Sequence, residues 1–253
     1  MNKRLSIKEI RERSGLPYKT HLYANVARWF SPYFLKLVLY TPLNPNDLTI
    51  FMIFVGLACA PLLLFNNYYL YILMVVLYQF YAFLDIVDGA LARIKQKFSN
   101  KGIYLDSLSH LIVEPAIFLC LGFGRFFLTN DLRLLILGVI IAFSQIVLRS
   151  LQPLVIYVKY KHLNLIKTTD IYKSKGGWDK KEAKVYNEQL PYSKLNTFDK
   201  IKLIVSKIYF IPNLTFIFSI FLLLNKPDYF LVFYGLTMPI IVLINIFLAI
   251  QRV

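Results

Sequence analysis

The chain has 253 residues, of which 57% are hydrophobic and only 17% are charged. This composition excludes an ordinary soluble domain and indicates a polytopic membrane protein. The formal net charge of +15 would suit a nucleic-acid-binding protein, but the basic residues follow the membrane topology described below. We therefore expect no nucleic-acid partner.

The N-terminal part, residues 1–47, is predicted to be a cytoplasmic segment. Residues 1–20 are polar, lack the apolar core of a signal peptide and are predicted to be a surface segment with little order. Residues 21–40 mix aromatic and basic side chains, which predicts an amphipathic helix lying along the membrane interface. A broken seventh span is the alternative. We favour the interfacial helix because Arg28 and Pro32 interrupt the apolar run.

Six apolar runs follow, each near the ~20 residues that a transmembrane helix requires. They cover residues 48–65, 68–92, 107–124, 133–157, 208–224 and 229–250. The sequence therefore predicts an all-α polytopic membrane protein with six transmembrane helices plus the N-terminal interfacial amphipathic helix. Residues 48–253 make up its membrane domain.

The basic residues predict the orientation of these spans. With the N-terminus inside, 25 of the 29 lysines and arginines fall in inner segments and three in outer loops. Such an excess of basic residues is typical of cytoplasmic loops, and anionic lipid head groups attract these residues. We expect an integral protein of a bacterial or archaeal inner (plasma) membrane, with both termini in the cytoplasm.

Residues 158–207 are predicted to form a long cytoplasmic loop. They contain 12 lysines, and glycine and proline residues break them into short pieces. A solvated surface loop is the plainest interpretation. The segment could instead cover the active site, bind a polar acceptor or dock a partner.

Three aspartates and a histidine fall where two apolar runs end. Asp85 and Asp88 are three residues apart, so they share a face of one helix; Asp106 and His110 are four apart and share a face of the next. Charged side chains at such positions are costly to desolvate and mark a functional site by default. Converging carboxylates need a cation, and oxygen ligands suit Mg²⁺.

The residues around these aspartates suit a ligand that carries two phosphates. A carboxylate-bound cation can neutralise a pyrophosphate and stabilise a leaving nucleotide. Gly89 and Ala92 are small enough for a nucleotide to lie against the helix. Gly102 permits either a turn of the chain or a close approach of a ligand. Arg93 could bind phosphate or be a basic residue that flanks a span.

The whole string resembles the signature of the CDP-alcohol phosphotransferase (CDP-alcohol phosphatidyltransferase) family, D-x2-D-G-x2-A-R-x8-G-x3-D-x3-D. Seven of its eight fixed residues are present: Asp85, Asp88, Gly89, Ala92, Arg93, Gly102 and Asp106. At the eighth position the family has an aspartate and this chain has His110. The signature spans residues 85–110 only, so it is this string that carries the resemblance.

The resemblance implies a membrane-embedded, metal-dependent transferase. It would move a substituted phosphate from a CDP-alcohol or CDP-diacylglycerol to a hydroxyl acceptor in lipid or lipid-linked glycan synthesis, releasing CMP. It also implies a homodimer, contact with membrane lipids and one or two Mg²⁺ (or Mn²⁺) ions. The implied metal ligands are Asp85, Asp88, Asp106 and His110. The implied nucleotide-binding residues are Asp85, Asp88, Gly89, Ala92, Arg93 and Gly102, to which we add Asn46 and Thr49 from a Pro-Asn-Asp-Leu-Thr segment that could equally be a simple helix cap.

The catalytic residues expected are Asp106, His110 and Glu114. A neutral imidazole is a competent general base at cytoplasmic pH, so His110 is our candidate for the base. It could instead be a nitrogen ligand that favours Mn²⁺ or Zn²⁺ or leaves a single ion, or it could mark a loss of activity. Glu114, one turn further on the same face, could orient His110, replace it as base, or simply pack beside Pro115.

One arginine, Arg149, lies inside a predicted span and therefore needs an anionic partner. We favour the phosphate of an acceptor or lipid over a motif carboxylate. The alternative to an enzyme is a lipid-binding protein or small transporter, which would distribute polar residues along several spans near the midplane. Here the acidic residues gather at one membrane edge, which favours the enzyme.

Overall fold

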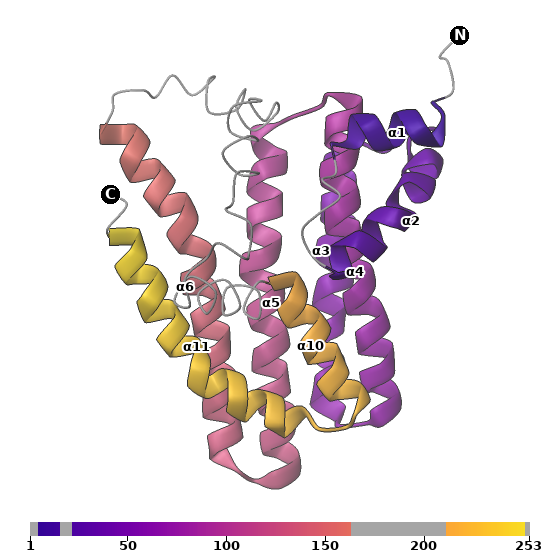
Figure 1. Ribbon diagram of the computed structural model, residues 1–253. Helices are drawn as coiled ribbons and strands as arrows, with labels where there is room; N and C mark the ends of the chain where they lie inside the picture. The colour runs from indigo at the N-terminus through magenta and orange to yellow at the C-terminus, as the bar shows by residue number, and fades with distance from the viewer. Residues whose placement is uncertain (1–4, 16–21, 163–210, 251–253) are drawn as a thin grey trace, which may run out of the picture.

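The computed structural model describes residues 5–15, 22–162 and 211–250 (Figure 1). These residues form α-helices and one short 3-10 helix, and no strand occurs among them. In chain order the elements are α1 (Ile7–Ser14), α2 (Leu22–Val38), α3 (Pro45–Leu62), η1 (Leu63–Phe65), α4 (Tyr68–Lys95), α5 (Asn100–Thr129), α6 (Leu132–His162), α10 (Ile211–Leu223) and α11 (Pro227–Ile250). The predicted all-α class is confirmed.

Five helical segments in the described ranges are long and apolar enough to cross a membrane. They are Pro45–Phe65, Tyr68–Lys95, Asn100–Thr129, Leu132–Val155 and Pro227–Ile250. The chain is therefore a polytopic integral membrane protein. The predicted span 208–224 corresponds to α10, whose 13 residues measure about 20 Å against a bilayer core of roughly 30 Å. The residues before α10 lie outside the described ranges, so the sixth span stays a prediction.

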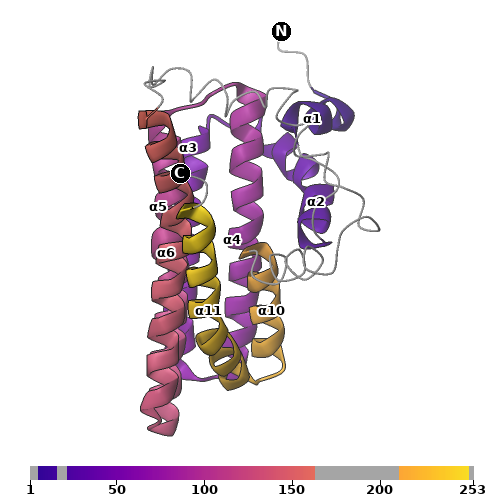
Figure 2. The same cartoon turned by 60° about the vertical axis from the view of Figure 1, so that its left-hand side comes forward.

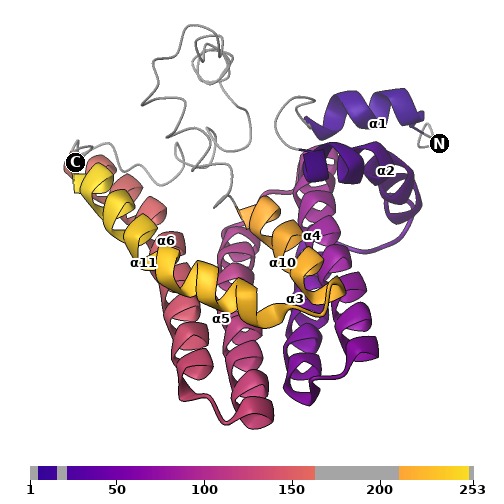
Figure 3. The ribbon, with the colours of Figure 1, turned by 60° about the horizontal axis from the view of Figure 1, so that its bottom comes forward.

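Helix α5 lies at the centre of the bundle. It packs between α3 and α6, and α4 lies against α3 (Figure 1). Helix α11 packs against α6, and α10 packs against α4 (Figure 2). Helices α1 and α2 lie beside the C-terminal end of α4 (Figure 3). The motif residues on α4 and α5 therefore lie toward the end of the bundle at which α1 and α2 gather.

Two glycines allow α5 and α6 to come into close contact. A Cβ added at Gly138 would lie 2.8 Å from the Cα of Gly122, so a larger residue would push the helices apart. Small residues commonly permit such close approach between membrane helices. Because these helices run in opposite directions, the contact sets the segment of α6 around Arg149 beside the segment of α5 around Glu114.

An aromatic cluster attaches the last two helices to α5. The rings of Phe118, Phe218 and Phe230 come from α5, α10 and α11, and their centroids lie 4.7 to 5.8 Å apart. All three side chains are buried. The cluster therefore fixes the packing of α10 and α11 one to two turns beyond the polar residues of α5.

The N-terminal segment is more ordered than its sequence predicted. Residues 7–14 form α1, which begins with a reciprocal capping box: the Ser6 side chain accepts from the Glu9 backbone, and the Glu9 carboxylate accepts from the Ser6 N–H at 2.7 Å. Ile10 is fully buried. The Ser-x-x-Glu spacing is the signal that identifies this helix.

The predicted interfacial helix corresponds to α2, which spans most of residues 21–40. Trp29, Phe30 and Tyr33 are about half exposed along it, as an amphipathic helix at an interface requires, and its position in the membrane stays a prediction. Of the predicted loop 158–207, the first residues belong to α6, and the rest lie outside the described residues.

Helix α5 begins earlier than predicted, at Asn100 and not near residue 107. The Ser99 hydroxyl caps it by accepting from the Gly102 N–H at 3.0 Å. The predicted start was too late because the apolar run begins only after the charged residues of this segment. The helix itself also includes those charged residues and therefore starts earlier. The polar turn between α4 and α5 is thus only residues 96–99, and the motif carboxylates lie inside continuous helices.

Candidate active site

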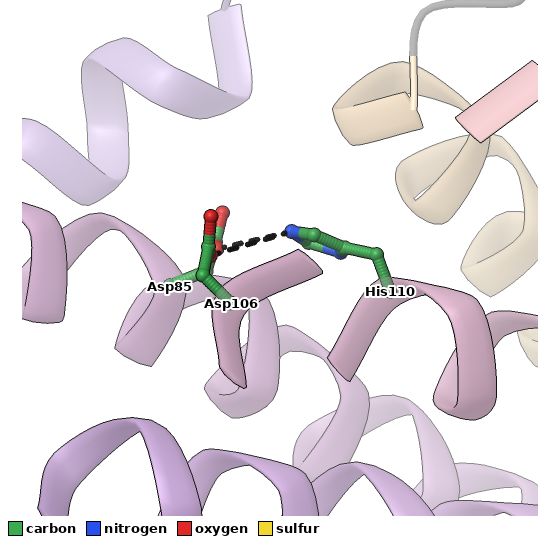
Figure 4. A group of neighbouring side chains, drawn as sticks. All are labelled: Asp85, Asp106 and His110. Atoms are coloured by element: carbon green, nitrogen blue, oxygen red, sulfur yellow. Dashed lines mark ion pairs between the residues drawn. The ribbon is translucent and has the colours of Figure 1, made fainter. Parts of the chain in front are cut away.

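Asp85, Asp106 and His110 meet where α4 and α5 lie near each other (Figure 4). The Nε2 atom of His110 is 3.3 Å from Asp85 Oδ1 and 3.8 Å from Asp106 Oδ1. One possible ligand atom from each residue lies within 4.8 Å of those of the other two. Two carboxylates from different helices thus face the same imidazole nitrogen.

Gly102 near the start of α5 leaves room for the side chain of Asn46 from the start of α3. A Cβ at Gly102 would lie 2.7 Å from Asn46 Oδ1 and 3.2 Å from Ser99 Oγ. A larger side chain would have to displace the Asn46 side chain. Gly102 lies within helix α5, and its close neighbour is Asn46. The close approach of a ligand at Gly102 stays a prediction.

Exposure decreases steadily from the opening of this site to its base. The side chains of Asp106 and Asp85 are 50% and 36% exposed, that of His110 is 16% exposed, and that of Glu114 is 3% exposed. The two aspartates are therefore accessible to a ligand that enters from water or from the interface. Glu114 is inaccessible to it.

The other ring nitrogen of His110, Nδ1, faces three side chains. It lies 3.2 Å from Glu114 Oε1, 3.2 Å from the Tyr81 hydroxyl and 3.1 Å from Arg149 Nη2. The two nitrogens of the ring thus face different surroundings: Nε2 faces the open carboxylates, and Nδ1 faces a buried polar cluster.

Arg149 forms an ion pair with Glu114 across α5 and α6. Its Nη2 is 2.5 Å from Glu114 Oε1, and its Nε is 3.3 Å from Oε2. Two partners for Arg149 were considered from the sequence, a phosphate and a carboxylate of the motif. In the structure its partner is a carboxylate, that of Glu114, which lies outside the motif. Binding of an acceptor phosphate by Arg149 stays a prediction.

Asp88 lies outside the group of Asp85, Asp106 and His110. It is 7% exposed, and its Oδ2 accepts a hydrogen bond of 2.7 Å from the Thr49 hydroxyl on α3. The group of nearby ligand atoms therefore contains Asp85, Asp106 and His110 but not Asp88. A role for Asp88 as metal ligand stays a prediction.

Arg93 connects the motif to the N-terminal helix. Its Nε donates to the backbone carbonyl of Ser14, at the C-terminal end of α1. Its guanidinium also lies over Gly89, where an added Cβ would be 3.5 Å from Nη1. A small residue at position 89 thus leaves room for the arginine side chain, and Ala92 is half-buried on the same turn of α4.

A pocket of about 310 Å³ lies between the start of α3 and the connection from α4 to α5. Its lining residues are Asn44, Pro45, Asn46, Asp47, Ile50, Lys97, Phe98, Ser99 and Lys101. Lys97 donates to Asn44 Oδ1 at 3.0 Å, and Ser99 Oγ lies 3.2 Å from Asn46 Oδ1. Asn46, predicted to contact the nucleotide, thus lines a pocket with two basic side chains.

The donor atoms of Asp85, Asp106 and His110 fit a divalent cation. Carboxylate oxygens suit Mg²⁺ and Mn²⁺, and an imidazole nitrogen suits Mn²⁺ or Zn²⁺ better than Mg²⁺. Their partial exposure leaves room for ligands from a substrate. The site therefore can hold a cation between two helices and present it to a phosphate.

Tyr81 is a site residue that the sequence analysis missed. Its side chain is buried, its hydroxyl contacts His110, and its ring stacks on Tyr78 with centroids 5.9 Å apart. It lies one turn before Asp85 on α4. The i, i+4 spacing was available in the sequence, but tyrosines are common in this chain.

Comparison with curated proteins finds no match to this chain. Comparison with protein-family models finds one family, described as CDP-alcohol phosphatidyltransferase, over residues 43–250. The matched range includes every element from α3 to α11 and all residues of the motif.

Proposed function

The chain belongs to the CDP-alcohol phosphatidyltransferase family, and on this basis we propose that it moves a substituted phosphate from a CDP-linked donor to a hydroxyl acceptor and releases CMP. The donor would be a CDP-alcohol or CDP-diacylglycerol, and the acceptor a lipid or another alcohol. The observation that carries the proposal is the meeting of Asp85, Asp106 and His110 at a partly exposed site.

In the proposed reaction, the acceptor oxygen attacks the donor phosphorus that carries the alcohol. A new phosphorus–oxygen bond forms there, and the bond from that phosphorus to the bridging oxygen of CMP breaks. The electron pair of the broken bond leaves with CMP. The proton of the acceptor hydroxyl passes to Nε2 of His110, which acts as the general base.

Asp85, Asp106 and Asp88 would hold the divalent cation, either Mg²⁺ or Mn²⁺. When bound, the cation neutralises the donor pyrophosphate and stabilises the leaving CMP. The Thr49 hydroxyl would orient the Asp88 carboxylate, which it already contacts. Gly89 and Ala92 would leave room for the nucleotide along α4.

His110 cannot use one lone pair for two tasks. If Nε2 binds a cation, it cannot also accept the hydroxyl proton. We favour the base over the ligand because Mg²⁺ prefers oxygen, and three aspartates supply it. The position of Nε2, next to both Asp85 and Asp106, supports a proton acceptor directly beside the phosphate-binding site.

We further propose that the site faces the cytoplasm and that the protein is a homodimer. The first rests on the distribution of lysines and arginines. The second rests on the resemblance to the family. Cysteine labelling at position 180 in intact cells tests the orientation, because an impermeant reagent should fail to label Lys180→Cys from outside.

The proposed reaction is tested with purified protein in Mg²⁺ or Mn²⁺, a panel of CDP-alcohols and CDP-diacylglycerol, and a lipid extract as acceptor. We expect CMP release from at least one donor, and none after removal of the cation with a chelator. The Asp106→Asn variant is the matched negative control. A folded protein that releases no CMP from any donor would contradict the proposal.

A further inference from the structure

The N-terminal helix α1 contacts the motif although it lies outside the residues that match the family, 43–250. It packs against α2 and against α4, near the C-terminal end of α4 (Figure 3). Ile10 and Ser14 are fully buried, so one face of α1 is docked on the bundle. The proposed reaction gives this helix no role.

Arg93 of the motif makes a polar contact between α4 and α1. Its Nε donates to the Ser14 carbonyl, which is one of the last carbonyls of α1 and has no partner within the helix ladder. A cation at this end also meets the negative end of the helix dipole. The helix ends at Gly15, whose φ of +61° is the left-handed conformation that favours glycine. This end of α1 therefore has a defined shape that presents the Ser14 carbonyl to Arg93.

The Arg93 side chain lies between two glycines, one from each helix. A Cβ added at Gly15 would lie 3.4 Å from Arg93 Cδ and 3.6 Å from its Nε. A Cβ added at Gly89 would lie 3.5 Å from Nη1 and 3.9 Å from Nη2. The guanidinium is planar and rigid, so the contact that fixes Nε also fixes the two Nη nitrogens over Gly89.

Asp85, Gly89 and Arg93 follow at intervals of four residues and therefore share one face of α4. Long side chains on a helix point back toward its N-terminus, and Arg93 accordingly reaches back over Gly89. Gly89 is about 6 Å along the helix axis from Asp85, whose side chain is 36% exposed. A pyrophosphate bound beside Asp85 would thus meet the guanidinium along the same face.

We infer that α1 is part of the donor site: its Ser14 carbonyl and its Gly15 turn hold the Arg93 guanidinium over Gly89, where it binds a phosphate of the donor. Ile10, Ser14 and Gly15 are then positioning residues that act through Arg93. The inference rests on the proposed function for the donor, which carries a nucleoside diphosphate. The family signature implies that Arg93 binds the nucleotide, but the matched residues do not include α1.

Hydrogen exchange of the parent with and without CDP tests the inference directly. If docked α1 favours the binding of CDP, bound CDP must favour docked α1 by the same factor. With Mg²⁺ and saturating CDP, we expect slower exchange of the backbone amides of residues 7–14, followed by mass spectrometry. Mg²⁺ without CDP is the control. Unchanged exchange of α1 in protein saturated with CDP would overturn the inference.

The second test undocks α1 without a change in the motif. Ile10→Asn places an amide at the buried position, and Glu12→Asn is the matched control because Glu12 is exposed on the same helix. We expect the affinity for CDP in Mg²⁺, measured by calorimetry, to fall roughly tenfold in Ile10→Asn, as for loss of one hydrogen bond to a charged group. Glu12→Asn should bind as the parent does. Parent-like affinity in Ile10→Asn protein whose α1 amides exchange freely would contradict the inference.

Arg93→Lys tests whether α1 acts through the arginine. Lysine keeps the charge but has a single nitrogen, which cannot lie both at the Ser14 carbonyl and over Gly89. We expect a similar loss of affinity in Arg93→Lys and little further loss in Ile10→Asn/Arg93→Lys, because residues that act as a unit are not additive. Additive losses would show that α1 does not act through Arg93.

The kinetics of CMP release separate this inference from the proposed reaction. Ile10→Asn should raise the KM for the donor roughly tenfold and leave kcat nearly unchanged, because Asp85, Asp106 and His110 are not altered. A parent that binds CDP but releases no CMP would contradict the proposed reaction alone, and the exchange and affinity measurements would still decide the role of α1. A parent that binds no CDP would overturn the inference.

Discussion

Helix α5 carries two ion pairs that look alike but differ in what surrounds them. Near the C-terminal end of α5, Arg125 binds Asp228 of α11 through two contacts, at 2.5 and 2.6 Å. At the middle of α5, Glu114 binds Arg149 of α6, also through two contacts. Each pair joins α5 to another helix.

The pair at Arg125 forms a closed, neutral network. Asn66 donates to the Gly124 carbonyl and accepts from both Arg125 and the Tyr71 hydroxyl. One cation meets one carboxylate, and the neighbours are neutral groups. This network fixes the turn before α4 to the end of α5.

The pair at Arg149 adjoins an excess of negative charge. Beyond Glu114 and His110 lie the carboxylates of Asp85 and Asp106, and Asp88 is on the same helix as Asp85. Exposure also increases in that direction. Converging carboxylates that open outward are costly unless a cation or a ligand balances them. The comparison thus separates a pair that stabilises the bundle from one that supports a site.

The largest effect should follow from removing one of the excess carboxylates. Asp85→Asn keeps the size of the side chain but removes the charge that would hold a cation against the donor. We expect CMP release to fall by roughly 10³-fold or more, as for other phosphoryl-transfer groups, while membrane insertion is retained. Activity within a few-fold of the parent would show that Asp85 does not belong to the active site. The surroundings of Arg149 would then not differ from those of Arg125 in holding a catalytic carboxylate.

The next largest effect concerns His110. His110→Ala should reduce kcat by roughly 10²- to 10⁴-fold, as expected for loss of a general base, with binding of the CDP-linked donor largely retained. His110→Asp restores the residue usual in the family and should keep measurable activity. Because carboxylates ionise at lower pH than imidazole, the acid limb of its pH–rate profile should also move to lower pH.

Metal dependence distinguishes the two roles left open for His110. If the imidazole is chiefly a ligand, raised Mn²⁺ should restore the activity of His110→Ala, and a missing base cannot be restored in this way. Parent-like activity of His110→Ala without added Mn²⁺ would exclude both roles. Glu114 could not then replace His110 as the base, because its side chain is only 3% exposed and is paired with Arg149.

A smaller effect is expected at Thr49, which contacts Asp88 from another helix. Thr49→Val removes the hydroxyl at nearly constant volume and leaves the buried carboxylate without this donor. A hydrogen bond to a charged group contributes about 1.5 kcal/mol, so kcat/KM should fall about tenfold. Thr49→Ser keeps the hydroxyl and should remain near the parent. Equal activity of both variants would mean that Asp88 needs no support from Thr49.

The contacts within one helix were largely predictable from the sequence. The spacing of Asp106, His110 and Glu114 fixes a common face of α5, because side chains four residues apart are neighbours on a helix. The all-α class was predicted from the long apolar runs. The family signature implied a metal site of Asp85, Asp88, Asp106 and His110, and three of these residues lie together in the structure.

The contacts between helices were not predictable in this way. Arg149 and Glu114 are 35 residues apart, and Thr49 and Asp88 are 39 apart. Such pairs depend on which helix faces meet, and this is set by packing features such as the contact of Gly122 with Gly138. The sequence showed that Arg149 needs an anion, but hydropathy alone could not identify the anion as Glu114.

The smallest effect on catalysis should come from the pair of Arg125 and Asp228 near the C-terminal end of α5. The side chain of Arg125 is 14% exposed and that of Asp228 is 38% exposed, so water already screens part of their interaction. Asp228→Asn should lower stability by about 1 kcal/mol, between the values for exposed and buried pairs. Thermal unfolding in detergent should show a lower midpoint, and CMP release at low temperature should stay within about twofold of the parent. This outcome follows because the network around Arg125 is neutral and Arg125 lies about four turns of α5 from His110. A loss of activity comparable to that of Asp85→Asn, in protein that remains folded, would show that the surroundings of the two ion pairs are coupled and that the separation of a stabilising pair from a site-supporting pair is wrong.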